Sequence, residues 1–223
     1  MKSIKTKLGF DGMLAVSCNG RRGGLALLWR EGVTVDTQTY SPNHIDVAVH
    51  TQSSPIWRLT GIYGHPEEER KLDTWRLMRH LHARASLPWV CLGDFNELLA
   101  SNEKNGGNMR SLAPMAEFRH TLLHYGLVDM GFSGYRFTWR NRRPGAAFVE
   151  ERLDRAVATS EWCEIFPRAK VSHLSVSYSD HDPIMLDTAP PTQSRRRRQK
   201  IQRFEEKWAT HTDCERIIQE SWN

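Results

Sequence analysis

The chain has 223 residues and a mass of 25.8 kDa, a length that suits one domain and is too short for two domains of ordinary size. Apolar residues make up 39% and charged residues 26%, and no apolar run approaches the roughly 20 residues of a membrane-spanning helix. The net charge is +5, of which residues 192–223 carry +3 (eight Lys and Arg against five Asp and Glu), so a polyanionic partner is compatible with the charge but not identified by it.

The N-terminus and the cysteines indicate the kind of cellular compartment in which the protein is expected. Met1–Lys7 is basic and has no apolar stretch behind it, so we expect no signal peptide and no secretion. The four cysteines are widely spaced and form no Cys-X-X-Cys pair, which argues against a zinc ribbon and against a small disulfide scaffold. We therefore expect a reducing compartment, the cytosol or the nucleus.

The first third of the chain has the period-two pattern of β-strands, broken by turn-forming residues such as Asn19-Gly20 and Glu31-Gly32. In Ile45–His50, apolar residues alternate with Asp46, Ala48 and His50, which predicts a half-buried strand. The strands predicted here are Met13–Val16, Gly23–Trp29, Val33–Tyr40, Ile45–His50 and Trp57–Tyr63.

The remainder alternates helices with short strands. Pro66–Ala85 begins with proline and three glutamates and has one apolar side, as an amphipathic helix does. Trp89–Gly93 is continuously apolar, which suits a strand buried on both faces. Further helices are predicted at Pro114–Tyr125 and Glu161–Phe166, and further strands at Phe137–Trp139, Arg152–Ala158, Val171–Val176 and Ile184–Leu186.

Many short strands with few helices, and no strict βαβ alternation, predict an α+β fold in which two packed sheets are flanked by helices. A Pro-Pro boundary divides the chain into a domain (1–189), a Pro/Arg-rich linker (190–200) and a helical segment (201–223). The basic run Arg195–Lys200 within the linker has three interpretations: a solvated linker, which we prefer, a nuclear localisation signal, or a contact to a nucleic-acid backbone.

The first polar cluster is Gly93-Asp94-Phe95-Asn96, directly after the predicted buried strand. A carboxylate and an amide two residues apart can both project into a cleft at the end of that strand. An Asx-rich turn explains the same residues equally well.

The second cluster is Ser179-Asp180-His181-Asp182-Pro183, before an apolar strand. Asp180 could bind a metal or orient a water, and the His181 imidazole could stabilise charge or transfer a proton. For an isolated Asp-His pair, a polar turn ended by proline is the commoner explanation.

The third cluster is Glu151-Arg152-Leu153-Asp154-Arg155, in a strand-like segment. Arg152 and Asp154 share one face of that strand, and an inward aspartate can orient a histidine by accepting its second N–H. A charged, solvated strand face is the commoner alternative.

Taken in order, GDFN after a buried strand, the Thr138-Trp139 pair, RLD and SDHDP resemble the endonuclease/exonuclease/phosphatase superfamily. Within it the chain is most similar to the apurinic-type endonuclease domain of plant LINE (non-LTR) retrotransposons. The flanking pieces Gly20–Trp29, Thr60–Pro66, Arg136–Trp139 and Phe166-Pro167 also match, so the resemblance covers essentially the whole chain. It implies a DNase I-like, four-layer α/β-sandwich.

The resemblance implies a role for each matching residue. Asp94 would orient or deprotonate the attacking water, and Asn96 would hold that water and the phosphate. His181 would stabilise charge on the phosphoryl oxygens, with its tautomer fixed by Asp154, and Tyr63 would hydrogen-bond a phosphate oxygen. Asp180 would lie at the site of the cofactor, Mg²⁺ or Mn²⁺, because carboxylates with such a cation supply the charge neutralisation that phosphodiester hydrolysis needs.

The family pattern also begins with an asparagine and a metal-binding glutamate, each at the end of an early strand, and neither residue precedes Leu8. We therefore expect the domain to lack its first strands and to bind metal weakly. The reverse transcriptase that follows this domain in the retroelements is also missing, and 201–223 resembles the junction towards it.

The leading hypothesis is a Mg²⁺-dependent DNA endonuclease domain, with DNA as partner, no membrane association and a nuclear location. The expected DNA contacts are Thr138, Trp139, Arg140, Arg142 and Arg143. Two alternatives remain open: a catalytically dead nucleic-acid-binding remnant, and a phosphatase of the same fold that acts on small phosphate esters. His80, His82, His120 and His124 have helical spacing and are expected on solvated helix faces, without a role.

Overall fold

The computed structural model describes residues 2–17, 24–52, 54–84 and 86–189. By its contacts the chain divides into Met1–Pro190 and Pro191–Asn223, and all described residues belong to the first unit. The predicted linker, its basic run and the helical segment 201–223 lie outside the described residues.

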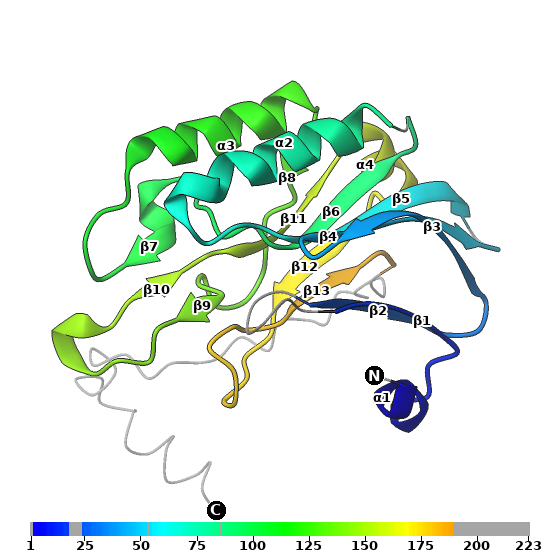
Figure 1. Cartoon of the computed structure of the whole chain (residues 1–223), viewed down its shortest axis with the longest axis horizontal. Helices are drawn as coiled ribbons and strands as arrows, with labels where there is room; N and C mark the ends of the chain where they lie inside the picture. The colour runs from blue at the N-terminus through cyan, green and yellow to red at the C-terminus, as the bar shows by residue number, and fades with distance from the viewer. Residues whose placement is uncertain (1, 18–23, 53, 85, 190–223) are drawn as a thin grey trace, which may run out of the picture. The chain divides into compact units, whose positions relative to one another are not determined.

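A six-stranded mixed sheet forms the centre of the first unit (Figure 1). Its order is β3 (Val33–Ser41), β4 (His44–Thr51), β5 (Ser54–Tyr63), β6 (Trp89–Asp94), β11 (Asp154–Ala158) and β8 (Val128–Asp129). The β5–β6 pair is parallel and the other neighbours are antiparallel. A parallel pair needs a long crossover, which the 3-10 helix η1 (Glu68–Arg70) and α2 (Lys71–His82) provide.

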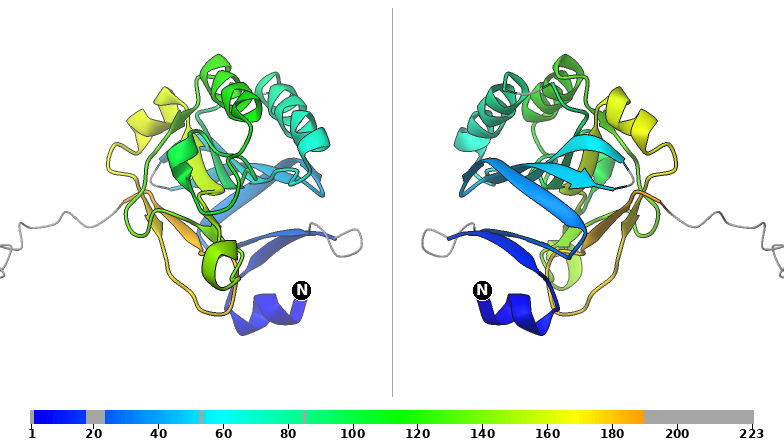
Figure 2. Two further views of the ribbon diagram at one scale, coloured as in Figure 1. Left: turned by 90° about the vertical axis from the view of Figure 1, so that its left-hand side faces the viewer. Right: turned by 90° about the vertical axis from the view of Figure 1, so that its right-hand side faces the viewer.

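Helices α2 and α3 (Leu112–His124) cover one face of this sheet (Figures 1 and 2). Their apolar sides meet the sheet in one core, in which Trp75 and Phe118 stack with ring centroids 4.6 Å apart. The core includes Met78, Leu81, Trp89, Cys91, Phe95, Leu122 and Val157. None of the described helices is long and apolar enough to cross a membrane.

Two separate hairpins cover the opposite face (Figure 2). They are β1 (Gly12–Val16) with β2 (Leu25–Trp29), and β12 (Lys170–His173) with β13 (Ile184–Asp187). Leu14 and Leu27 of the first hairpin pack on Val47 of β4, and Leu186 of the second lies in a cluster with Val90 of β6. Helix α1 (Lys2–Lys7) precedes the first hairpin, and α4 (Ser160–Ile165) places Trp162 in the cluster with Val90. The predicted α+β sandwich is confirmed.

Short elements surround the end of the sheet where β6 finishes. They are η2 (Ser101–Glu103), β7 (Lys104–Asn105), β9 (Trp139–Arg140), η3 (Gly145–Ala147) and β10 (Glu150–Glu151). Strands β7, β10 and β9 form a small antiparallel sheet in that order. The sequence pattern missed β7, β8 and β10, because two-residue strands have no measurable periodicity.

Three of the elements predicted from the sequence differ from those in the structure. Strand β4 is buried on both faces: Asp46 is only 1% exposed, because Arg58 on β5 pairs with it at 2.8 Å. The predicted helix 66–85 is shorter, since its first turn is the 3-10 helix η1 and α2 ends at His82. The predicted strand 171–176 ends at His173, after which Leu174 N donates to the Pro183 carbonyl.

Candidate active site

The strand register places three of the predicted catalytic side chains in one row. Asp94 ends β6, where it pairs with Tyr63 of β5 on one side and with Asp154 of β11 on the other. Directly opposed residues in neighbouring strands have side chains on the same face. The two carboxylates therefore lie next to each other, an arrangement that is unfavourable for two negative charges.

Gly93 explains why β6 can approach β5 so closely at this point. Its φ is +142°, and a Cβ built on it would lie 2.2 Å from the Ile62 carbonyl oxygen. Any side chain here would push β6 away from β5. The glycine of the GDFN motif thus sets the position of Asp94.

His181 reaches the two carboxylates from the loop before β13. Its Nδ1 lies 2.9 Å from Asp154 Oδ2 and its Nε2 lies 3.9 Å from Asp94 Oδ2. With Nδ1 donating to Asp154, Nε2 is the ring nitrogen that faces Asp94. This is the predicted orientation of His181 by Asp154.

Asn96 contacts Asp94 with both its backbone and its side chain. Its backbone N–H donates to Asp94 Oδ1 at 2.8 Å, and its Nδ2 donates to Asp94 Oδ2 and to the Gly64 carbonyl, both at 2.9 Å. The φ of Asn96 is +53°, a conformation that asparagine tolerates better than most residues. The GDFN segment is therefore an Asx turn, as one interpretation predicted, and also part of the site.

The charges in this cluster are not balanced. Burial, followed by the charge of Asp154, raises the pKa of Asp94 to about 6, although His181 and the Asn96 N–H act in the opposite direction. Burial alone would lower the pKa of His181, but its hydrogen bond to Asp154 and the charges of Asp154, Asp94 and Asp180 together raise it above the ordinary value of 6.5. Asp94 is thus a stronger base than an ordinary aspartate, and His181 is more readily protonated than an ordinary histidine.

The same cluster fits a divalent cation. Ligand atoms of Asp94, Asp154 and His181 lie within 4.8 Å of one another, and they make up the group of at least three such ligands found in the described part of the chain. Carboxylate oxygens suit Mg²⁺ and Mn²⁺, and imidazole suits transition metals. A cation would also relieve the repulsion that raises the pKa of Asp94.

Asp180, the predicted metal ligand, is not a member of this group. Its side chain is exposed, and Oδ2 accepts a hydrogen bond from Trp139 Nε1 at 3.2 Å. The Asp180 carbonyl accepts from Arg140 N, and Trp139 and His181 form a β-bridge. Trp139 therefore braces the loop that carries His181.

Thr138 is fully buried, which differs from its predicted contact with DNA. Its hydroxyl accepts hydrogen bonds from Leu153 N and Asp154 N at 3.0 and 2.9 Å, and its carbonyl accepts from Asp182 N at 2.7 Å. Thr138 thus joins the strand of Asp154 to the loop of His181. Its side chain has no surface available to a nucleic acid.

The three predicted DNA-contacting arginines lie beside this loop. Arg140 forms an ion pair with Asp182, a residue only 4% exposed. Arg142 donates to the carbonyls of Ser177 and Ser179, and Arg143 is exposed. Arg140 and Arg142 therefore support the loop in this structure, while Arg142 and Arg143 present charge on the surface next to the site.

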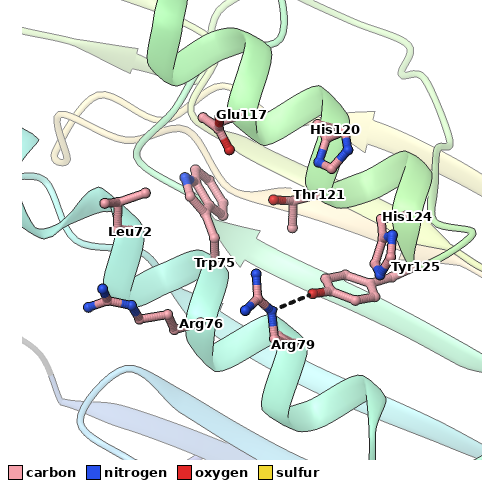
Figure 3. Close-up of a pocket in the computed structure, with 9 residues that line it drawn as sticks. All are labelled: Leu72, Trp75, Arg76, Arg79, Glu117, His120, Thr121, His124 and Tyr125. Atoms are coloured by element: carbon pink, nitrogen blue, oxygen red, sulfur yellow. Dashed lines mark hydrogen bonds between the residues drawn. The ribbon is translucent and has the colours of Figure 1, made fainter.

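A hollow of about 380 Å³ lies elsewhere, between α2 and α3 (Figure 3). Arg76 and Arg79 line it from α2, and His120 and His124 line it from α3. Arg79 Nε donates to the Tyr125 hydroxyl at 3.3 Å across it. None of the predicted catalytic residues lines this hollow.

The structure adds residues that the sequence did not single out. Asp182 holds the His181 loop through Thr138, Val176 and Arg140, and its place beside His181 in SDHDP is a sequence signal for this role. Lys71 Nζ donates to the Asn96 carbonyl and pairs with the buried Glu97 at 3.1 Å. No spacing links Lys71 to Asn96, so only the fold brings them together.

Comparisons with known proteins agree with this fold. Residues 6–181 match the model of the Endonuclease/Exonuclease/phosphatase family. The endonuclease domain of TRAS1, a telomere-specific non-LTR retrotransposon, is similar in structure (TM-score 0.59, 17% identity, 79% of this chain and 78% of that chain covered). So is the 3′ phosphatase NExo from Neisseria, solved with a product DNA hairpin (0.59, 17%, 83% and 81%). The catalytic domain of Xenopus laevis APE2 is a third (0.54, 17%, 74% and 70%). No curated protein sequence matches the chain.

Proposed function

Because the chain belongs to the Endonuclease/Exonuclease/phosphatase family, we propose that it is a DNA endonuclease domain that hydrolyses phosphodiester bonds with a divalent cation. The observation that carries the proposal is the cluster of Asp94, Asp154 and His181, to which Asn96 is hydrogen-bonded. The motifs that resemble plant LINE elements support an origin in a retrotransposon, and such an origin agrees with a nuclear location.

Two structural neighbours support DNA as the substrate class. One is described as the endonuclease domain of a non-LTR retrotransposon, and another is described in complex with a product DNA hairpin. The exposed Arg143 and the Arg142 side chain beside the His181 loop would face a polyanionic backbone.

Asp94 would act on the attacking water. Without a cation, burial and the charge of Asp154 raise its pKa to about 6, so it is ionised at pH 7 and can accept a hydrogen bond from that water. Its two oxygens offer about four acceptor positions, so the hydrogen bonds from Asn96 still leave room for a water. Asn96 holds Asp94 in place.

His181 would act on the phosphoryl oxygens. Its raised pKa favours the imidazolium form, and the hydrogen bond to Asp154 keeps Nε2 directed towards the site. Imidazolium beside a developing oxyanion lowers the energy of the transition state. Tyr63, in register with Asp94, would donate to another phosphate oxygen.

Asp94 and Asp154 are the residues that would hold Mg²⁺ or Mn²⁺. When bound, the cation would neutralise charge on the phosphate and on these two carboxylates. The family's glutamate ligand has no counterpart in this cluster, so we expect weak binding of Mg²⁺.

A phosphatase of the same fold is the second candidate, since one structural neighbour is described as a 3′ phosphatase. It would use the same residues, with a terminal phosphate in place of a phosphodiester. The third candidate is a DNA-binding remnant. Such a chain would retain the cluster and bind DNA but would not hydrolyse it.

The test is nicking of supercoiled plasmid DNA with Mg²⁺, beside release of phosphate from a 3′-phosphorylated oligonucleotide and from an inositol phosphate. We expect nicking by the wild-type chain, and a loss of roughly 100- to 10,000-fold in Asp94→Ala. Asp73→Ala, on the exposed side of α2, is the matched control and should nick normally. Phosphate release without nicking would support the phosphatase. Salt-sensitive DNA binding without any hydrolysis would support the remnant.

A further inference from the structure

The backbone of Asn96 is held in an uncommon conformation by buried charges. Its φ of +53° aims Nδ2 at both Asp94 and the Gly64 carbonyl, and the residue is only 9% exposed. Asparagine tolerates this left-handed conformation better than most residues, and contacts from its surroundings hold it here.

Two cations bind the carbonyl oxygen of Asn96. Lys71 Nζ donates a hydrogen bond to it, and Arg110 Nη1 donates a second one at 3.2 Å. Because both donors converge on one oxygen, they fix the peptide plane between Asn96 and Glu97. The orientation of that plane helps to fix the direction in which the side chain leaves the Cα of Asn96.

Lys71 is an unusual residue for its position. It is the first residue of α2, where the helix dipole disfavours a cation, and only 6% of it is exposed. Burial lowers its pKa, against the opposing effect of Glu97. Its charged group has two buried partners, the Glu97 carboxylate and the Asn96 carbonyl, and these contacts hold a lysine at this position.

Buried carboxylates balance the two cations. Glu97 is 1% exposed and lies 3.1 Å from Lys71 and 3.6 Å from Arg110. Arg110 also pairs with Glu151 of β10. The network thus connects the start of α2, the loop after η2 and β7, and β10 to the backbone of one site residue.

We propose that Lys71 is a positioning residue for hydrolysis: through the Asn96 carbonyl it fixes the Asn96 side chain against Asp94, a role that rests on the proposed function of the site. Lys71 acts on the carbonyl of Asn96, while the amide Nδ2 acts on Asp94. The substrate would meet the amide, and Lys71 itself would not touch it.

Arg58 offers a matched control for a purely structural role. It is a cation 1% exposed, it pairs with Asp46 at 2.8 Å, and it donates to a helix carbonyl, that of Leu81, at 2.8 Å. No contact connects it to Asp94, Asn96 or His181 in the described residues. Arg58→Met should therefore lower stability without disturbing the site.

The experiment compares Lys71→Met/Glu97→Gln with Arg58→Met and the wild type. The double variant removes both charges together, so neither remains buried without its partner, and the amide oxygen introduced by Glu97→Gln can still accept the hydrogen bond from Leu98 N. Two readouts are taken on folded protein: kcat and KM for plasmid nicking, and the side-chain amide resonances of Asn96 in ¹⁵N-asparagine-labelled protein, assigned by their loss in Asn96→Ser.

We expect the double variant to lower kcat about 10- to 100-fold with KM changed less than about threefold, and to shift the Asn96 amide resonances. Arg58→Met should leave kcat and these resonances as in the wild type. Unchanged Asn96 resonances in the double variant would overturn the proposal whatever the activity. A wild-type chain that hydrolyses nothing would refute the proposed function, while the resonances would still decide whether Lys71 positions Asn96.

Discussion

Two buried charge clusters meet at the start of β11, and they differ in how well their charges are compensated. Asp154 belongs to the active-site cluster, whereas its neighbours Arg152 and Arg155 pair with Glu103 and Asp129. The four ion pairs of this arginine network measure 2.7–2.9 Å, and every arginine contacts both carboxylates.

The pKa values follow that difference. In the arginine network burial would raise the pKa of Glu103 and of Asp129, but hydrogen bonds and charge from Arg155 and Arg152 outweigh it and lower both. In the active-site cluster one imidazole faces two carboxylates, and the pKa of Asp94 rises to about 6. Burial is similar, so the balance of charge separates a stabilising network from a reactive site.

The largest effect is expected from His181→Ala. Removing the imidazole takes away the group that would stabilise the phosphoryl oxygens, so nicking should fall roughly 100- to 10,000-fold, as measured by initial rates on supercoiled plasmid. His50→Ala, a half-buried histidine paired with Asp36 on β3, is the control and should retain activity. Normal nicking by His181→Ala would remove His181 from the site.

Substitutions in the arginine network should instead lower the free energy of unfolding. Arg155 is fully buried, so Arg155→Met leaves Glu103 and Asp129 with too little compensation and should lower the free energy of unfolding in urea by about 3–5 kcal/mol. Arg76→Met, which breaks an exposed ion pair with Asp73, should lower it by less than about 1 kcal/mol. Equal losses in the two variants would contradict the distinction.

Acid should weaken the same network. Because the folded pKa values of Glu103 and Asp129 are lowered, their contribution is fully present above about pH 4, the usual range for carboxylates in the unfolded chain, and is lost as the pH falls through the folded values. The measurement is the difference in unfolding free energy between wild type and Glu103→Gln/Asp129→Asn from pH 7 to pH 2. We expect this difference to shrink below pH 4; a constant difference would show that charge is not involved.

The smallest effect is expected in the hollow between α2 and α3. His120→Ala/His124→Ala should change neither the nicking rate nor, by more than about 0.5 kcal/mol, the free energy of unfolding, because no residue of the site lines that cavity. A loss of nicking in this variant would show that catalysis depends on the hollow between α2 and α3 and not only on the cluster of Asp94, Asp154 and His181.

The sequence predicted the site better than it predicted the supports of the site. Asp94, Asn96, Asp154 and His181 lie at strand ends or in short motifs, but each motif alone also has a purely structural explanation, and only their order along the chain, through the resemblance, selects them. The register that pairs Asp94 with Asp154 is a long-range property, because the two residues are 60 positions apart in the sequence. Within the sequence, only the resemblance to the family indicates that these residues lie close together.

Two errors have a common physical cause. The alternating pattern of Ile45–His50 predicts a solvated face for Asp46, and the Thr-Trp motif of the resemblance predicts a DNA contact for Thr138. Each is buried and fully hydrogen-bonded, Asp46 to Arg58 and Thr60, and Thr138 to the backbone of Leu153 and Asp154. A polar residue whose partner comes from a distant strand cannot be distinguished by local pattern from one that faces water.

The role of Asp94 as a destabilised, reactive carboxylate is tested most directly with the variant Asp94→Asn. The nicking rate and the free energy of unfolding are measured on one preparation of this variant, and the unfolding is done in the presence of a chelator. An aspartate with a pKa near 6 destabilises the fold at pH 7 by on the order of 3 kcal/mol, so its neutral isostere should lose nicking without losing stability. We expect a nicking rate at least 100-fold slower than that of the wild type and an unfolding free energy equal to or above the wild-type value. A variant that nicks normally, or that loses several kcal/mol of stability, would contradict this role of Asp94.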